Sequence, residues 1–187
     1  MVQAMSQVLS LKSPVEANLL IVVFDLTNFT QFSRSNESSE VFRQMKAFNS
    51  MSAEFVKANG GLILKFLGDA CLCVFPVDHA SNVITAMVDF TAKVDDWLKE
   101  KIPGSRLTVN CHVGPVTIGP TPGYNGQPQI DAIGEAVNIC FAMSHRGFVI
   151  SPEAFRSLTP EAKRNFKKFT QPIVYLLSEQ QLEAPSK

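Results

Sequence analysis

Short, unbroken runs of apolar residues alternate along this chain with longer stretches in which apolar residues recur at helical spacing. The run at 19–25 is apolar until its last residue, a pattern typical of a strand that is buried on both faces in a parallel sheet. Seven further runs complete the predicted strands: 62–66, 70–75, 107–113, 116–118, 148–150, 166–170 and 172–177.

Apolar residues three and four positions apart predict two long helices, over 38–58 and 78–100. The glycines at 60 and 61 end the first of them, as is usual at a helix C-terminus. Three shorter stretches complete the helical prediction. One begins at Ser151, as the N-cap, and Pro152, at the first helical position. Residues 27–32 predict a turn or short helix, and residues 134–144 predict a third helix.

Glycine and proline mark the predicted turns. Gly68 separates two strands by the spacing of a hairpin. Gly114 and Pro115 predict a second turn, which would end one strand before the next begins. Residues 121–129 are rich in proline, glycine and asparagine, and so predict a surface loop.

The order of these elements predicts an α+β fold, in which helices pack on a mixed sheet. A length of 187 residues suits one domain with a sizeable core. We expect a loose N-terminal arm over residues 1–18, a folded domain over 19–178 and a polar tail over 179–187.

The charge balance and hydropathy of the chain limit the classes of partner that it is expected to bind. The chain has 17 basic and 17 acidic residues, whereas a nucleic-acid binder is usually more basic, so we expect no nucleic-acid partner. No apolar run approaches the roughly 20 residues that span a bilayer. The first residues lack the basic and apolar pattern of a signal peptide. We therefore expect no membrane partner and a cytoplasmic location.

Two aspartates stand beside the apolar runs. Asp25 ends the first run, and Asp69 immediately precedes the run at 70–75. A carboxylate at the end of an apolar strand is costly unless something pairs with it. Two of them on neighbouring strands would form a hard-oxygen site suited to Mg²⁺ or Mn²⁺. Such a site is the start of a phosphoryl-transfer centre.

Three blocks of this sequence resemble the motifs of class III nucleotidyl cyclases. Residues 24–30 resemble the first metal motif, residues 60–69 the second and residues 131–138 the third. The resemblance runs from about residue 19 to residue 177. It implies the ferredoxin-like βαββαβ core of that family. It also implies conversion of a nucleoside triphosphate into a 3′,5′-cyclic nucleotide and pyrophosphate, for second-messenger signalling.

The resemblance implies that Asp25 and Asp69 hold two Mg²⁺ or Mn²⁺ ions per site. Two ions about 4 Å apart suit in-line attack of the 3′-hydroxyl on the α-phosphate. The amides before a short helix favour anions, so the phosphates would face a backbone segment. That segment consists of Leu26, Thr27, Asn28 and Phe29. The simpler interpretation makes Asp25 a helix cap and Asp69 a turn residue.

Lys65 and Asp131 are the base-reading residues that the resemblance implies. In adenylate-forming relatives a lysine and an aspartate at these positions read adenine, the ammonium on a ring nitrogen and the carboxylate on the amine. The carboxylate also suits cytosine or uracil, and short stand-alone cyclases resemble the bacterial pyrimidine cyclases of antiphage signalling. ATP and UTP or CTP therefore both stay open. A smaller base needs bulk in the pocket, for which Met45 and Phe48 are candidates.

Asn138 would orient the ribose, by the same resemblance. Family members usually carry an arginine four residues later, where this chain has Ala142. Arg146, one helical turn further, is a candidate replacement. Lys167 or Lys168 could also compensate, and Lys168 is the predicted phosphate-binding lysine. Otherwise the chain turns over slowly, or it is a degenerate cyclase that only binds a nucleotide or a partner.

The resemblance also implies a partner. In this family the metal-binding residues face the base- and ribose-reading residues across a dimer interface. One chain here carries both sets. A head-to-tail homodimer with two equivalent, shared active sites is therefore expected.

Overall fold

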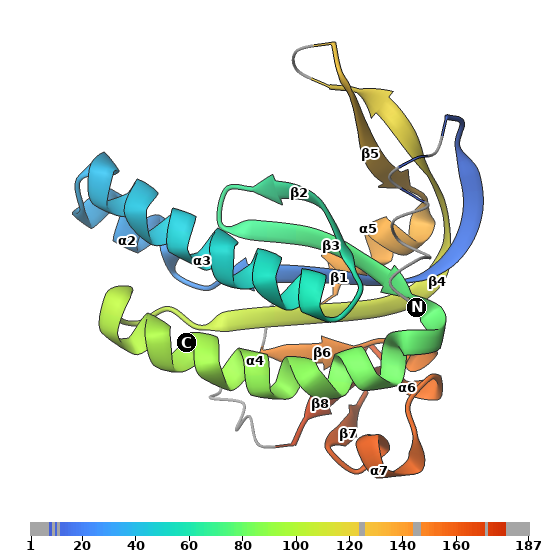
Figure 1. Cartoon of the computed structure of the whole chain (residues 1–187). Coiled ribbons are helices and arrows are strands. Elements are labelled where there is room, and N and C mark those ends of the chain that lie inside the picture. The colour runs from blue at the N-terminus through green and yellow to red at the C-terminus, as the bar shows by residue number, and fades with distance from the viewer. Residues whose placement is uncertain are drawn as a thin grey trace.

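The computed structural model describes residues 8, 10, 12–123, 126–143, 147–170 and 172–178 (Figure 1). The described strands form one sheet, in the order β2-β3-β1-β4-β6-β8-β7, with β5 paired to β4. The strands are β1 (Val15–Leu26), β2 (Leu62–Leu67), β3 (Ala70–Pro76), β4 (Leu107–Pro122), β5 (Pro128–Ile133), β6 (Phe148–Ile150), β7 (Phe166–Phe169) and β8 (Val174–Leu177). The helices are α2 (Phe29–Ser35), α3 (Ser38–Ala58), the 3-10 turn η1 (Val77–His79), α4 (Ala80–Lys101), α5 (Glu135–Ala142), α6 (Pro152–Arg156) and α7 (Pro160–Lys163).

β1 is the central strand and is buried on both faces, as its apolar run predicts. Both of its neighbours, β3 and β4, are antiparallel, so the expectation of parallel neighbours was wrong. An unbroken apolar run records burial on two faces and carries no information on strand direction. β1 also begins at Val15, so residues 15–18 belong to the sheet instead of the expected loose arm. The pair β4 and β6 is parallel, which makes the sheet mixed, as predicted.

The long helices α3 and α4 cover one face of the sheet, which we call the helical face (Figure 1). Alternate residues of β1, Phe24 among them, point to this face and form the main core with both helices. The ring of Phe90 lies between those of Phe24 and Phe55, with centroid distances of 5.4 Å and 4.4 Å. None of the described helices is both long enough and apolar enough to cross a bilayer.

The opposite face, which we call the site face, is covered by α5. The intervening residues of β1, such as Ile21 and Val23, point there and pack against Ala136 and Cys140 of α5. α5 approaches β4 closely at Gly114, where a Cβ atom would lie 2.7 Å from that of Ala136. A residue without a side chain is therefore needed at this crossing.

Adding a methyl group at Gly114 should push α5 away from β4, because the new Cβ would also lie 2.9 Å from Nε2 of His112. We expect Gly114→Ala to lower the free energy of unfolding by about 1–3 kcal/mol, the usual cost of overpacking, as measured by urea denaturation. Ala136→Gly in the same chain removes the facing methyl group and should recover part of the loss. Wild-type stability of Gly114→Ala would contradict the close crossing.

β4 runs unbroken through Gly114 and Pro115, so the turn predicted there was wrong. On the edge away from β1, β4 pairs with β6 at 109–111 and with β5 at 117–122. Pro115 falls between these two pairings, where a missing N–H costs least. The second half of β4 and β5 form a hairpin that rises from the body of the molecule (Figure 1). β5 had no counterpart in the prediction, which assigned residues 121–129 to a loop.

Candidate active site

Asp25 is the penultimate residue of β1 and lies half-buried on the site face, because its neighbours in the strand point to the helical face. Its Oδ1 atom accepts a hydrogen bond from the amide of Leu26 at 3.0 Å. Its carbonyl oxygen accepts a second bond, at 3.1 Å, from the hydroxyl of Thr108 in β4. The backbone that carries this carboxylate is therefore held from the neighbouring strand.

Asp69 lies half-buried in the turn between β2 and β3, directly after Gly68, whose φ of 67° is left-handed. The register between β1 and β3 ends with Phe24 opposite Cys71. If this antiparallel register is continued, Asp25 lies opposite Ala70 and Leu26 lies opposite Asp69. Both carboxylates thus stand at the same end of adjacent strands. Two partly exposed carboxylates so placed are the donors that Mg²⁺ and Mn²⁺ prefer.

The segment from Leu26 to Phe29 is only partly available to phosphates. The amide of Leu26 donates to Asp25, and the amide of Thr27 donates to the carbonyl of Arg106 at 3.0 Å. Two of the four predicted phosphate contacts are therefore already used within the protein. The amides of Asn28 and Phe29 remain candidates, and Asn28 takes the left-handed conformation, with a φ of 57°, just before α2.

Lys65 of β2 and Asp131 of β5 form an ion pair, with 2.6 Å between Nζ and Oδ2. A β-bulge between Ile63 and Lys65 makes this possible. Strict alternation from Ile63, which packs on the helical face, would send Lys65 to that face too, whereas the bulge places it opposite Leu72 on the site face. The structure thus brings together the two residues predicted to read the base.

Met45 and Phe48 do not belong to this region, so the prediction that they fill the base pocket was wrong. Phe48 is fully buried in the core of the helical face, and Met45 packs against the same core. The sheet separates them from Lys65 and Asp131. Their inward orientation on α3 reflects burial in the core and has no bearing on the size of the base.

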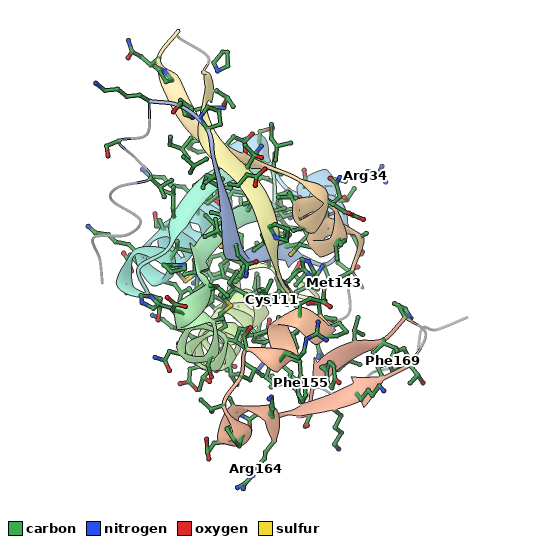
Figure 2. The ribbon with its side chains drawn as sticks, turned by 90° about the vertical axis from the view of Figure 1, so that its right-hand side faces the viewer. Arg34, Cys111, Met143, Phe155, Arg164 and Phe169 are labelled. Atoms are coloured by element: carbon green, nitrogen blue, oxygen red, sulfur yellow. The ribbon has the colours of Figure 1, made fainter. Side chains whose placement is uncertain are left out.

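Asn138 and Ala142 are both exposed on α5 and lie four residues apart, so they share one face of that helix. The helix predicted over 134–144 ends at Ala142, because Met143 is extended. Arg146, the predicted replacement for the missing arginine, lies outside the described residues. Figure 2 shows Met143 next to α5.

Lys167 and Lys168 are exposed neighbours in the edge strand β7, and they lie on different faces. Lys168 pairs with Tyr175, whose ring stacks at 3.7 Å on Phe155 of the helical face, beside the β7–β8 hairpin (Figure 2). Lys167 pairs with Leu176, which packs on the opposite side of the sheet. The register therefore favours Lys167 over Lys168 as a cation on the site face.

Three polar side chains of β4 are buried on the site face, and the sequence reasoning missed them: Thr108, Asn110 and His112. Asn110 donates to the carbonyl of Met143 at 3.5 Å, at the point where α5 ends. His112 lies 2.9 Å from the hydroxyl of Ser151, and burial lowers its pKa below the ordinary value. The signal was available, since a polar residue recurs at every second position of this apolar run.

Residues 12–172 match the family described as the adenylate and guanylate cyclase catalytic domain. Because the match spans most of the 187 residues, the chain belongs to this family. An adenylate cyclase of Anabaena cylindrica is 24% identical over 129 residues, which are 65% of this chain and 26% of that protein. The chain spans about a quarter of the length of the curated relatives it matches.

Solved structures support the same fold. A bacterial light-regulated adenylyl cyclase superposes with a TM-score of 0.80 at 16% identity, over 92% of this chain and 55% of that one. The guanylyl cyclase Cya2 superposes with a TM-score of 0.73 at 18% identity, over 92% of this chain and 97% of that one. The predicted class III cyclase fold is therefore confirmed.

Proposed function

We propose that this chain is the catalytic domain of a nucleotidyl cyclase, which converts a nucleoside triphosphate into a 3′,5′-cyclic nucleotide and pyrophosphate for second-messenger signalling. The arrangement of the site face carries this proposal. It combines two carboxylates at one end of adjacent strands, Asp25 and Asp69, with the Lys65–Asp131 pair. The first set suits the phosphates and the second suits a base, so in a head-to-tail dimer the first set of one copy and the second set of the other would match the two ends of one nucleotide.

Two Mg²⁺ or Mn²⁺ ions held by Asp25 and Asp69 would supply charge neutralisation at the phosphates and at the attacking 3′-hydroxyl. The protein's own groups would hold the phosphates and the ribose in position for the reaction. The amides of Asn28 and Phe29 are the proposed donors to the phosphate oxygens. Asn138, which is exposed on α5, is the residue proposed to bind the ribose. In-line displacement needs no covalent intermediate, so this division of roles is sufficient for the reaction.

The base that the site favours is adenine. The ammonium of Lys65 and the carboxylate of Asp131 offer a donor beside an acceptor, which suits a ring nitrogen beside an amine. Cytosine presents the same edge, so a pyrimidine cyclase of antiphage signalling is the second candidate. The placement of Met45 and Phe48 in the core removes the bulk that would have favoured the smaller base.

A cation near the α-phosphate is the element that Ala142 does not provide. Lys167 lies on the site face by register and is our preferred substitute, ahead of Lys168 and Arg146. If none of these supplies the charge, the chain binds a nucleotide or a partner without turnover. The presence of both Asp25 and Asp69, the carboxylates of the two metal motifs, favours catalysis over binding alone.

A head-to-tail homodimer completes the site. Two exposed apolar residues lie next in sequence to the predicted nucleotide contacts, Ile133 at 66% exposure beside Asp131 and Ile139 at 39% beside Asn138. A second copy of this chain would cover them. Light scattering should therefore give twice the mass of one chain in the presence of nucleotide and Mn²⁺. A mass of one chain at micromolar concentration would count against shared sites.

The decisive experiment incubates the purified protein with ATP, GTP, UTP and CTP separately, each with Mn²⁺, and identifies the products by mass spectrometry. We expect cyclic AMP. Cyclic CMP or cyclic UMP would select the pyrimidine candidate. Absence of product from all four nucleotides, together with measurable nucleotide binding, would replace the cyclase proposal by the binding module.

Ala142→Arg should raise kcat, because it restores a cation on the face of α5 that carries Asn138. An arginine that contacts developing phosphate charge contributes several kcal/mol, so we expect a rise of about tenfold or more in initial-rate assays. Ala92→Arg, at an exposed position of α4 on the other face of the sheet, is the matched control and should change nothing. A steep loss in Ala142→Arg would mean that this surface already holds a different catalytic arrangement.

A further inference from the structure

We infer that the segment from Gly104 to Thr108 is a brace that holds the metal loop, residues 25–28, in its active geometry. Thr27 of the loop and Thr108 of the brace act as positioning residues. The inference rests on the proposed function, since it concerns the loop that carries Asp25 and leads into the phosphate contacts. Asp25, Thr27 and Asn28 each make a hydrogen bond to the brace, and Leu26 pairs with Leu107 in the strand ladder.

Two hydrogen bonds join Thr27 and Arg106. The amide of Thr27 donates to the carbonyl of Arg106 at 3.0 Å, and the amide of Arg106 donates to the hydroxyl of Thr27 at 2.9 Å. The strand ladder between β1 and β4 has already ended at the pair Leu26 and Leu107. The hydroxyl of Thr27 therefore extends the pairing by one residue beyond the point where the sheet itself stops.

Asn28 makes the next contact, donating from Nδ2 to the carbonyl of Gly104 at 2.8 Å. This residue is the one non-glycine position with a positive φ among the described residues, at 57°. Such a conformation costs an ordinary side chain about 1 kcal/mol. The bond to Gly104 offsets part of this cost, so the brace also stabilises the turn that aims the amides of Asn28 and Phe29.

Thr108 holds the other end of the loop. Its hydroxyl is buried and donates to the carbonyl oxygen of Asp25 at 3.1 Å. The brace is in turn fixed to α4, because Asp95 accepts the amide of Leu107 at 2.7 Å. Burial raises the pKa of Asp95, and this bond to the Leu107 amide opposes the rise. A long, well-packed helix thus anchors the carboxylate that is proposed to bind metal.

The hydrogen bonds between the brace and the metal loop should affect kcat more than the affinity for the nucleotide substrate. The substrate gains most of its binding from base, ribose and phosphate contacts elsewhere, whereas in-line attack depends on the placement of Asp25 and the loop amides. A displacement near 1 Å can cost about 100-fold in rate. The brace is therefore expected to act on kcat and on the affinity for Mn²⁺.

The test uses Thr27→Val and Thr108→Val, which keep side-chain shape and remove the hydroxyl. Hydrogen–deuterium exchange over residues 25–32 and electron paramagnetic resonance titration of Mn²⁺ give two readouts that do not require turnover. We expect faster exchange, Mn²⁺ affinity lowered about fivefold, and kcat lowered about tenfold with KM changed less than about twofold. Thr27→Ser restores the hydroxyl and should return all three to wild-type values.

Two threonines of α4 provide matched controls. Thr85→Val removes an exposed hydroxyl that donates to the carbonyl of Ser81, and Thr91→Val removes a buried one that donates to Met87. Both should leave exchange over the metal loop and Mn²⁺ affinity unchanged. Wild-type exchange and Mn²⁺ affinity in both loop variants would overturn the inference. Faster exchange and weaker Mn²⁺ binding in the two variants would support the brace even if the wild type formed no cyclic nucleotide. In that case only the proposed cyclase activity would be rejected.

Discussion

Asp25→Asn and Asp69→Asn should each lower product formation about 1,000-fold or more while leaving the fold intact. Removing one electrostatic group from a phosphoryl-transfer or acyl-transfer site costs about 10²–10³ in kcat, and here the lost group is also a ligand. Both carboxylates are only half-buried, and asparagine has the same shape. The free energy of unfolding should therefore change by no more than about 0.5 kcal/mol.

The measurement pairs initial rates at saturating Mn²⁺ with urea denaturation of the same samples. Asp89→Asn is the matched control, since Asp89 is an exposed aspartate of α4 on the helical side of the sheet. It should match the wild type in both rate and stability. Activity within tenfold of wild type in either metal-site variant would remove that carboxylate from the metal site and leave its role as a turn or cap residue.

The order and type of most elements were predictable because burial leaves a periodic record in the sequence. The runs at 62–66 and 70–75 became β2 and β3, and the helical spacing over 78–100 became α4. What failed depends on partners that a local pattern does not contain. β4 continues through Pro115 because its neighbour on one edge changes there from β6 to β5. β5, with the sequence PQIDAI, contains no apolar run and is defined by its pairing with β4.

In the candidate site too, local motifs were predictable from the sequence, whereas features that depend on pairing between distant segments were not. Asp25, Asp69, Lys65 and Asp131 were predicted from their motifs. In the structure the first two stand at one end of adjacent strands, and the other two form an ion pair. The bulge before Lys65 was not predictable, because it is a property of the pairing with β3. The hydrogen bonds between the metal loop and the start of β4 join residues about 80 positions apart in sequence. The one sequence signal for these bonds was the polar residue at every second position of β4, which includes Thr108.

Loss of the Lys65–Asp131 pair should be the second largest effect, and it acts on substrate recognition. In Lys65→Met the ammonium donor disappears and Asp131 keeps a carboxylate without its cation. A site that binds a base through such groups discriminates strongly against a lost partner, so we expect kcat/KM for the preferred nucleotide to fall about 100-fold. The side chains are 36% and 16% exposed, so the cost in stability should be only about 1 kcal/mol.

Exchanging the two charges separates structure from recognition. Lys65→Asp together with Asp131→Lys can restore an ion pair, so its stability should recover relative to either single variant, as measured by thermal denaturation. The donor and the acceptor have then changed places, and an adenine edge meets like groups at both positions. We therefore expect kcat/KM for ATP to stay about 100-fold low while folding recovers. Recovery of both would show that the pair only links β2 to β5, and the base would have to be read elsewhere on the site face.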